Sequence, residues 1–187
     1  PALEAAARHV LELGRPRAAV FATTAHVSER AQRIFADFGL DLAAPRNRWR
    51  DSNDRIELAE ATGHATALRL AEEGELPRLA LVLDDHMARG FYTGLLEAGR
   101  RVPDDLQMIV WSNRGNRLRA SHEFSRIEND PIEHGHALAR ALIEMIEGPA
   151  GLRRTYHLGP RFIVGQTTCP VDASLTRGHS TNSKEKM

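Results

Sequence analysis

The sequence predicts an α/β fold, in which a parallel β-sheet is flanked by helices. Short apolar runs alternate along the chain with longer segments whose apolar residues recur at helical spacing, which is the pattern of βαβ units. The runs are apolar at successive positions, as in 79–83, and strands of this kind are covered on both faces of the sheet. The chain has 187 residues, enough for one domain or for two small lobes that share a chain.

In the first half of the chain, the predicted elements are helix 1–13, strand 18–22, helix 28–38, an irregular stretch over 40–54 and helix 58–73. Each of the helices carries apolar residues at helical spacing and is followed by a glycine, the usual residue after a helix end. The strand is a continuous apolar run. The irregular stretch contains proline and asparagine, which favour turns.

In the second half, the predicted elements are strand 79–83, helix 84–98, strand 106–111, a basic loop 113–120, strand 123–128, helix 130–147, and short strands 155–158 and 161–164. Aspartates open both helices, because a carboxylate caps the free N–H groups and opposes the helix dipole. The last residues, 169–187, are polar and lack an apolar period, which predicts a disordered tail.

Composition excludes several classes of protein. The 25 basic and 25 acidic residues cancel, so the chain has no charge excess for binding nucleic acid by itself. A single cysteine, Cys169, excludes a disulfide framework and a cysteine-based zinc cluster. No apolar run approaches a membrane span, and the charged N-terminal segment does not resemble a signal peptide. We therefore expect no membrane partner and a cytoplasmic location.

Polar residues follow several predicted strands. In parallel α/β sheets, the ligand crevice lies beyond the carboxyl ends of the strands. Thr24, Asp84, Ser112 and Asn113 occupy such positions. Arg30 falls in the first turns of the following helix, where a guanidinium can clamp vicinal hydroxyls or a carboxylate. The alternative for Arg30 is a solvated helix arginine.

Trp111 ends a predicted strand near the same rim. It could stack on the face of a sugar, and its alternative is a core aromatic residue.

Other chemistry finds less support. Asp84 and Asp85 could hold Mg²⁺ or accept a phosphoryl group, but one of them also suits a helix cap. His134 and His136 are two residues apart on a helix, so they point to different sides and do not chelate together. The chain contains no nucleophile elbow and no phosphate-binding glycine motif. We expect no catalytic residue, no metal and no cofactor.

The order of these segments resembles the effector-binding domain of the lac-repressor (LacI/GalR) family, itself similar to periplasmic sugar-binding proteins. The best match is 77–90, PRLALVLDDHMARG, which resembles the family's strand running into "(N/D)-D-x-M-A-x-G". The further matches are HVLELG at 9–14, SER at 28–30, EAGRRVPDDL at 97–106, IENDPIEHG at 127–135 and FIVGQTT at 162–168. Together they cover about 1–168.

The resemblance implies a type I periplasmic-binding-protein-like fold of two lobes with a crevice between them. This chain corresponds mostly to the C-terminal lobe. The implied division is an N-lobe helix at 1–14, the C-terminal lobe at 15–126, an N-lobe segment at 127–158 and the last C-lobe strand at 159–168. A chain of this extent should expose apolar surface on helix 130–147.

The family's ligand positions can be carried over one at a time. Arg30 matches the arginine that holds effector hydroxyls or a carboxylate. Asp84 matches an Asn or Asp that faces the ligand, and Asn129 falls on a crevice Gln. Ser112 stands where most members have an effector-binding Asp, and Asn113 could substitute for it. The stacking role falls to Trp111 or to Trp49. His26 and Thr24 lie on a loop that faces the crevice.

The resemblance implies the ligand-sensing, homodimerising module of a transcriptional regulator, whose effector is a sugar or sugar derivative. DNA would be reached only through an N-terminal domain that this chain lacks. The chain would bind its ligand and not transform it. One alternative is a periplasmic solute-binding protein of a transporter. A second, from another class, is a Mg²⁺-dependent or phosphotransfer enzyme that uses Asp84 and Asp85.

Overall fold

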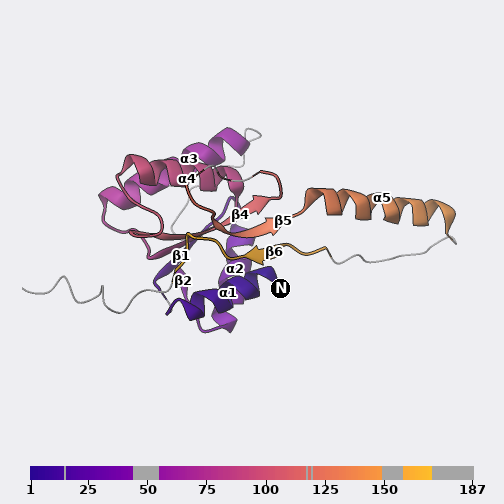
Figure 1. Ribbon diagram of the computed structural model, residues 1–187, viewed down its shortest axis with the longest axis horizontal. Helices are drawn as coiled ribbons and strands as arrows, with labels where there is room; N and C mark the ends of the chain where they lie inside the picture. Colours follow the sequence, from indigo (N-terminus) through magenta and orange to yellow (C-terminus); the bar gives the residue numbers. More distant parts are fainter. Residues whose placement is uncertain (15, 44–54, 117, 119, 149–157, 170–187) are drawn as a thin grey trace, which may run out of the picture.

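The structure is a computed structural model that describes residues 1–14, 16–43, 55–116, 118, 120–148 and 158–169 (Figure 1). Its helices are α1 (Ala2–Glu12), α2 (Ala25–Asp37), α3 (Arg55–Glu72), α4 (Asp85–Glu97) and α5 (Pro131–Glu147). Its strands are β1 (Ala18–Phe21), β2 (Leu42–Ala43), β3 (Leu79–Val82), β4 (Gln107–Asn113), β5 (Ser125–Asn129) and β6 (Arg161–Ile163). The predicted α/β class is confirmed.

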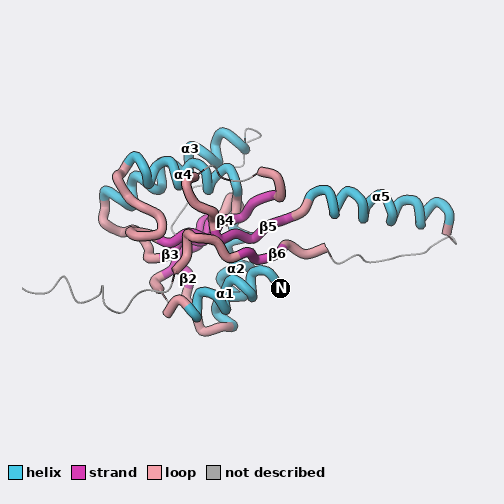
Figure 2. The backbone as a smooth tube through the Cα atoms, viewed as in Figure 1, coloured by secondary structure: helices cyan, strands magenta, loops and turns pink. Residues whose placement is uncertain are grey.

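The strands form a six-stranded sheet in the order β2-β1-β3-β4-β5-β6. Every neighbouring pair from β2 to β5 is parallel. The pair of β5 and β6 is antiparallel, with Ile127 opposite Phe162. The sheet is therefore mixed, and the prediction of a parallel sheet needs this correction at one edge. The strand that returns after α5 runs back along β5, as Figure 2 shows in magenta.

Helices cover both faces of the sheet. α1 and α2 lie on one face and α3 and α4 on the other (Figure 1). Side chains alternate between the two faces, so Ala18 and Val20 of β1 join the core beneath α1 and α2, whereas Ala19 and Phe21 join the core beneath α3 and α4. This double burial explains why the strand sequences are apolar at every position.

Caps decide where the helices begin. The Thr24 hydroxyl accepts a hydrogen bond from the Val27 amide at 3.4 Å, so α2 begins at Ala25, earlier than the predicted position 28. The Asp84 carboxylate accepts from the Met87 amide at 2.8 Å and caps α4.

α3 and α4 pack with their backbones unusually close together. A Cβ atom at Gly90 would lie 1.8 Å from the carbonyl oxygen of Glu60, and one at Gly63 would lie 2.2 Å from that of Met87. Glycine is therefore required at this helix crossing.

α1 packs against the sheet in this structure. Ala6, Ala7 and Val10 of α1 are fully buried in the core that also holds β1 and β3. α1 and the sheet share one continuous core, and the expected division at residue 14 stays a prediction. β5 continues in the sheet to Asn129, past the expected lobe boundary at 126, which also stays a prediction.

α5 projects away from the layers and carries no buried residue (Figure 1). Its large apolar side chains are exposed, with Leu138 at 71% and Ile146 at 74%. Leu142, Ile143, Met145 and Ile132 are exposed as well. The apolar surface expected on helix 130–147 is present.

Two predictions lie wholly or mainly outside the described residues: the strand over 155–158, of which Leu158 alone is described, and the tail over 169–187, of which Cys169 alone is described. Among the described helices, none is both long enough and apolar enough to cross a membrane.

Candidate functional site

The predicted polar rim forms at one edge of the sheet. β1, β3, β4 and β5 are parallel, so their carboxyl ends meet at the same edge. Thr24 follows β1, Asp84 follows β3, and Asn113 and Asn129 end β4 and β5. Their order across the edge follows the order of the strands.

Asn113 and Asn129 come together as direct neighbours. They are register partners in the parallel pair of β4 and β5, and the Asn129 side-chain amide donates to the Asn113 side-chain oxygen at 3.4 Å. The Arg114 amide then donates to the Asn129 carbonyl at 2.7 Å. The remaining donors and acceptors of the two amides can serve a ligand with hydroxyl groups.

Ser112 is buried, with 3% of its surface exposed. Its hydroxyl has no hydrogen-bond partner among the described residues. A buried hydroxyl without a partner carries a free-energy cost. Ser112 lies at the carboxyl end of β4, directly before Asn113.

Asp84 and Asp85 have separate partners. Asp84 caps α4, whereas Asp85 accepts from the Asn116 side-chain amide at 2.8 Å and from the His86 backbone amide at 3.1 Å. Within the described residues, no group of at least three His, Cys, Asp or Glu side chains is placed to hold a metal ion. Asp84 thus caps α4 with one oxygen, and Asp85 braces the loop that contains Asn116.

His26 and Arg30 lie one turn apart on α2 and are both exposed. Residues four apart share a helix face, so the two side chains can act on one ligand. Trp111 is half-buried and packs against the core beneath α1 and α2. It therefore behaves as a core aromatic residue in this structure, and its stacking role stays a prediction. Trp49 lies outside the described residues.

A cluster of charged residues beside this rim was not predicted from the sequence. Arg114 pairs with Asp130 at 2.6 Å, and Arg161 pairs with Glu133 at 3.9 Å. The Arg114 guanidinium holds the pKa of the Asp130 carboxyl below its usual range, assisted by the amides at the start of α5. The hydrogen bond to Asp130 also raises the pKa of the Arg114 guanidinium.

These charged residues line an open cavity of about 470 Å³ at the base of α5. An adjoining cavity of about 360 Å³ shares Arg114, Asp130, Glu133 and Arg161 with it. One signal in the sequence could have pointed to this cluster. Arg114 and Asp130 each directly follow a predicted ligand residue.

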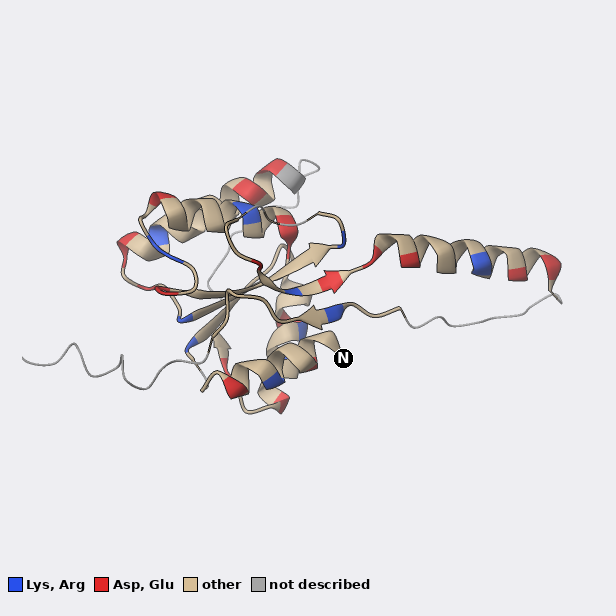
Figure 3. Ribbon diagram, viewed as in Figure 1, with Lys and Arg blue, Asp and Glu red and all other residues tan. Residues whose placement is uncertain are grey.

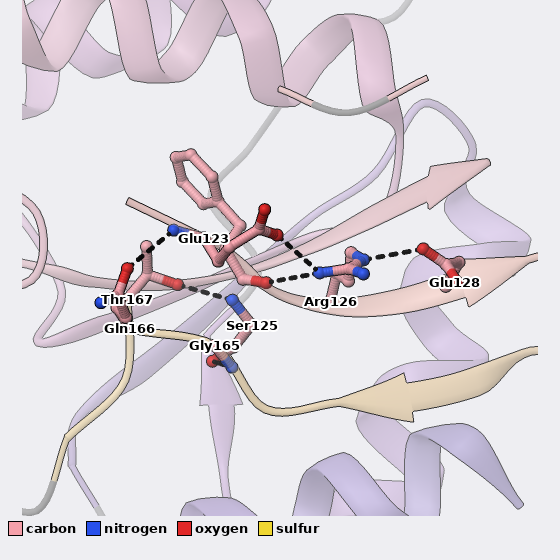
Figure 4. A network of polar contacts seen from close by, with 8 residues as sticks. Glu123, Ser125, Arg126, Glu128, Gly165, Gln166 and Thr167 are labelled. Carbon is pink, nitrogen blue, oxygen red and sulfur yellow. Dashed lines mark hydrogen bonds and ion pairs between the residues drawn. The ribbon is translucent and has the colours of Figure 1, made fainter. Parts of the chain in front are cut away.

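A polar network fixes the segment that closes the sheet (Figure 4). Arg126 is 7% exposed, and its guanidinium donates to Glu128 at 2.8 Å and Glu123 at 3.1 Å. The Ser125 hydroxyl accepts from the Gly165 amide at 2.9 Å, and the Ser125 amide donates to Thr167 at 2.9 Å. Pairing of the buried Arg126 charge offsets its desolvation. The two Ser125 hydrogen bonds hold β5 to the returning chain.

His9 of α1 extends this network. Its Nε2 lies 2.7 Å from the Thr168 hydroxyl, which lies 2.6 Å from the Ser125 hydroxyl. Burial lowers the pKa of His9, although Glu12 at 3.8 Å acts in the opposite direction.

Comparison with solved structures finds strong similarity of fold. A LacI family transcriptional regulator from Enterococcus faecium with bound ribose matches with a TM-score of 0.74 and 20% identity, over 91% of this chain and 63% of that one. A regulator of the same family from Corynebacterium glutamicum matches with a TM-score of 0.67 and 23% identity, over 90% and 64%. One from Lactobacillus casei with bound sucrose matches with a TM-score of 0.67 and 16% identity, over 89% and 62%.

The chain spans less than two thirds of the length of these solved structures. A search of curated proteins finds no match. The family model described as "periplasmic binding protein-like domain" matches residues 7–168. The match covers most of the chain, so the chain belongs to the periplasmic binding protein-like domain family.

Proposed function

We propose that this chain is the effector-binding part of a LacI-type transcriptional regulator and that it binds a small sugar or sugar derivative. The observation that supports the proposal most strongly is the polar rim, where Asn113 and Asn129 meet beside Asp84 and Thr24. Solved regulators of similar fold contain ribose or sucrose. Neutral amide and hydroxyl groups suit hydroxyl-rich ligands.

In this proposal, Arg30 and Asp84 hold hydroxyl groups, and Asn113 and Asn129 add hydrogen bonds. Ser112, His26 and Thr24 complete the polar wall, and Trp111 covers an apolar face of the sugar. The ligand is bound and released without chemical change.

The regulator acts through two lobes. In this proposal α5 belongs to the second lobe, and β6 returns the chain to the first. A ligand that binds better to one arrangement of the lobes shifts their equilibrium. The change reaches DNA through a separate DNA-binding segment, and the regulator works as a homodimer.

Calorimetric titration with ribose and with sucrose tests the assigned pocket. We expect Arg30→Ala to weaken sugar binding roughly 10- to 100-fold, because a charged hydrogen bond contributes about 1.5–3 kcal/mol. Arg100→Ala is the matched control, since Arg100 is an exposed arginine that precedes the amino end of β4. Equal affinity in Arg30→Ala and the unmodified chain would contradict the assignment.

A further inference from the structure

The cavity at the base of α5 joins basic side chains from three distant parts of the sequence. Arg114 comes from the turn after β4, Arg140 from the middle of α5 and Arg161 from β6. Figure 3 shows the corresponding basic positions on that turn, on α5 and on β6. The cavity of about 470 Å³ has the size of a small-molecule site.

The acidic side chains that line the cavity already have partners. One Asp130 oxygen accepts from Arg114, and the other accepts from the Ile132 and Glu133 amides at 3.1 and 3.2 Å. Glu133 lies 3.9 Å from Arg161, beyond hydrogen-bond distance. The Asp130 carboxylate is therefore satisfied within the chain, and Glu133 makes only this long ion pair.

The basic side chains keep most of their donors. A guanidinium has five N–H donors, and Arg114 uses one of its terminal nitrogens on Asp130. Within the described part of the chain, Arg140 has no carboxylate at ion-pair distance, and Arg161 has only the long contact to Glu133. With arginines at 114, 140 and 161 against Asp130 and Glu133, the lining carries a formal charge of +1. The N-terminal end of α5 adds a partial positive charge.

Two residues that line the cavity directly follow residues of the proposed sugar site along the chain. Asn113 immediately precedes Arg114, and Asn129 immediately precedes Asp130. Arg161 lies opposite Glu128 in the antiparallel pair of β5 and β6, one residue from Asn129. A ligand whose hydroxyls reach the two asparagines can thus place another group among the arginines.

We propose that this cavity binds the anionic group, phosphate or carboxylate, of an acidic sugar derivative. The inference rests on the proposed function and narrows its ligand class from sugars in general to negatively charged ones. Arginine binds both anions through forked, charge-assisted hydrogen bonds. Arg114, Arg140 and Arg161 provide these donors from a turn, a helix and a strand.

The test uses the whole chain and two simple probes, inorganic phosphate and acetate, in a buffer of low ionic strength. The Nε–Hε resonances of the arginines are followed by nuclear magnetic resonance during each titration. We expect saturable shifts at Arg114 and Arg161 with at least one probe, and the stronger probe identifies the preferred anion. The double variant Arg114→Gln, Arg161→Gln should bind it at least about tenfold more weakly.

Two controls separate the site from general charge effects. Arg78→Gln removes an exposed arginine next to the amino end of β3 and should leave binding unchanged. Arg114→Lys with Arg161→Lys keeps the charge and should retain part of the affinity. Absence of saturable shifts with both probes, or equal weakening in Arg78→Gln, would overturn the anion site.

A sugar titration distinguishes failure of this inference from failure of the proposed function. If ribose binds as tightly as ribose 5-phosphate and the anions do not bind, the anion site is wrong and the sugar site stands. If phosphate binds at the arginines while Arg30→Ala leaves sugar affinity unchanged, the anion site stands and the assignment of Arg30 is wrong.

Discussion

His9 gives the protein a pH-dependent contact at the scale of a single residue. Its ring is held between Thr168 and Phe162, and burial lowers its pKa. In the unfolded chain, the pKa of histidine is about 6.5. Between the lowered pKa and that value, the unfolded chain binds more protons, so the free energy of unfolding rises with pH.

We therefore expect the contribution of His9 to be complete above about pH 7 and to fall as the pH drops below about 6.5. Urea unfolding at several pH values measures this dependence. His9→Gln removes the titrating group while keeping a polar partner for Thr168, so the variant should lose part of the dependence. His136→Gln changes an exposed histidine on α5, and the same loss in this control would assign the effect elsewhere.

Three residues of the polar rim could be predicted from their places after apolar strands, and Asn129 was added by the family resemblance. Thr24, Asp84, Asn113 and Asn129 each mark the end of a strand, and the ends of parallel strands share an edge. Arg114, Arg140 and Arg161 could not be grouped in the same way. They come from a turn, a helix and an antiparallel strand, whose mutual placement depends on how α5 leaves the sheet.

At the scale of elements, the crossing of α3 and α4 requires glycine. We expect Gly90→Ala to destabilise the protein by about 1–3 kcal/mol or more, because the new methyl group would lie 1.8 Å from the Glu60 carbonyl oxygen. Chemical denaturation measures the change. In Gly135→Ala on α5, the methyl group meets nothing within 4 Å, and helix propensity favours alanine. A loss of stability in Gly135→Ala equal to that in Gly90→Ala would contradict the packing argument.

Most elements follow from local patterns, and the exceptions have physical causes. β2 consists only of Leu42 and Ala43. A strand of two residues is too short to show an alternating or a continuous apolar pattern. The direction of β6 is set by pairing with β5, which is a tertiary property. The place of α1 also depends on tertiary packing, because its amphipathic sequence suits any apolar surface.

At the scale of the whole molecule, the exposed apolar face of α5 departs from an ordinary globular surface. We expect the chain to bind a hydrophobic fluorescent dye strongly, since exposed apolar patches of this kind are uncommon on soluble monomers. The double variant Leu142→Gln, Ile146→Gln should reduce the fluorescence and leave the denaturation midpoint of the sheet unchanged. Both side chains are more than half exposed, so a marked fall in the midpoint would show that they pack against the sheet.

We expect α5 and the rest of the described chain to unfold differently on heating. A 17-residue helix without buried side chains depends on its Asp130 cap and its own backbone hydrogen bonds, and such helices are marginal in water. Its helicity should decline gradually on heating, whereas the sheet and its four covering helices melt in one cooperative step. Far-ultraviolet circular dichroism would then show a steep baseline before the main transition, with the fastest-exchanging helical amides confined to α5.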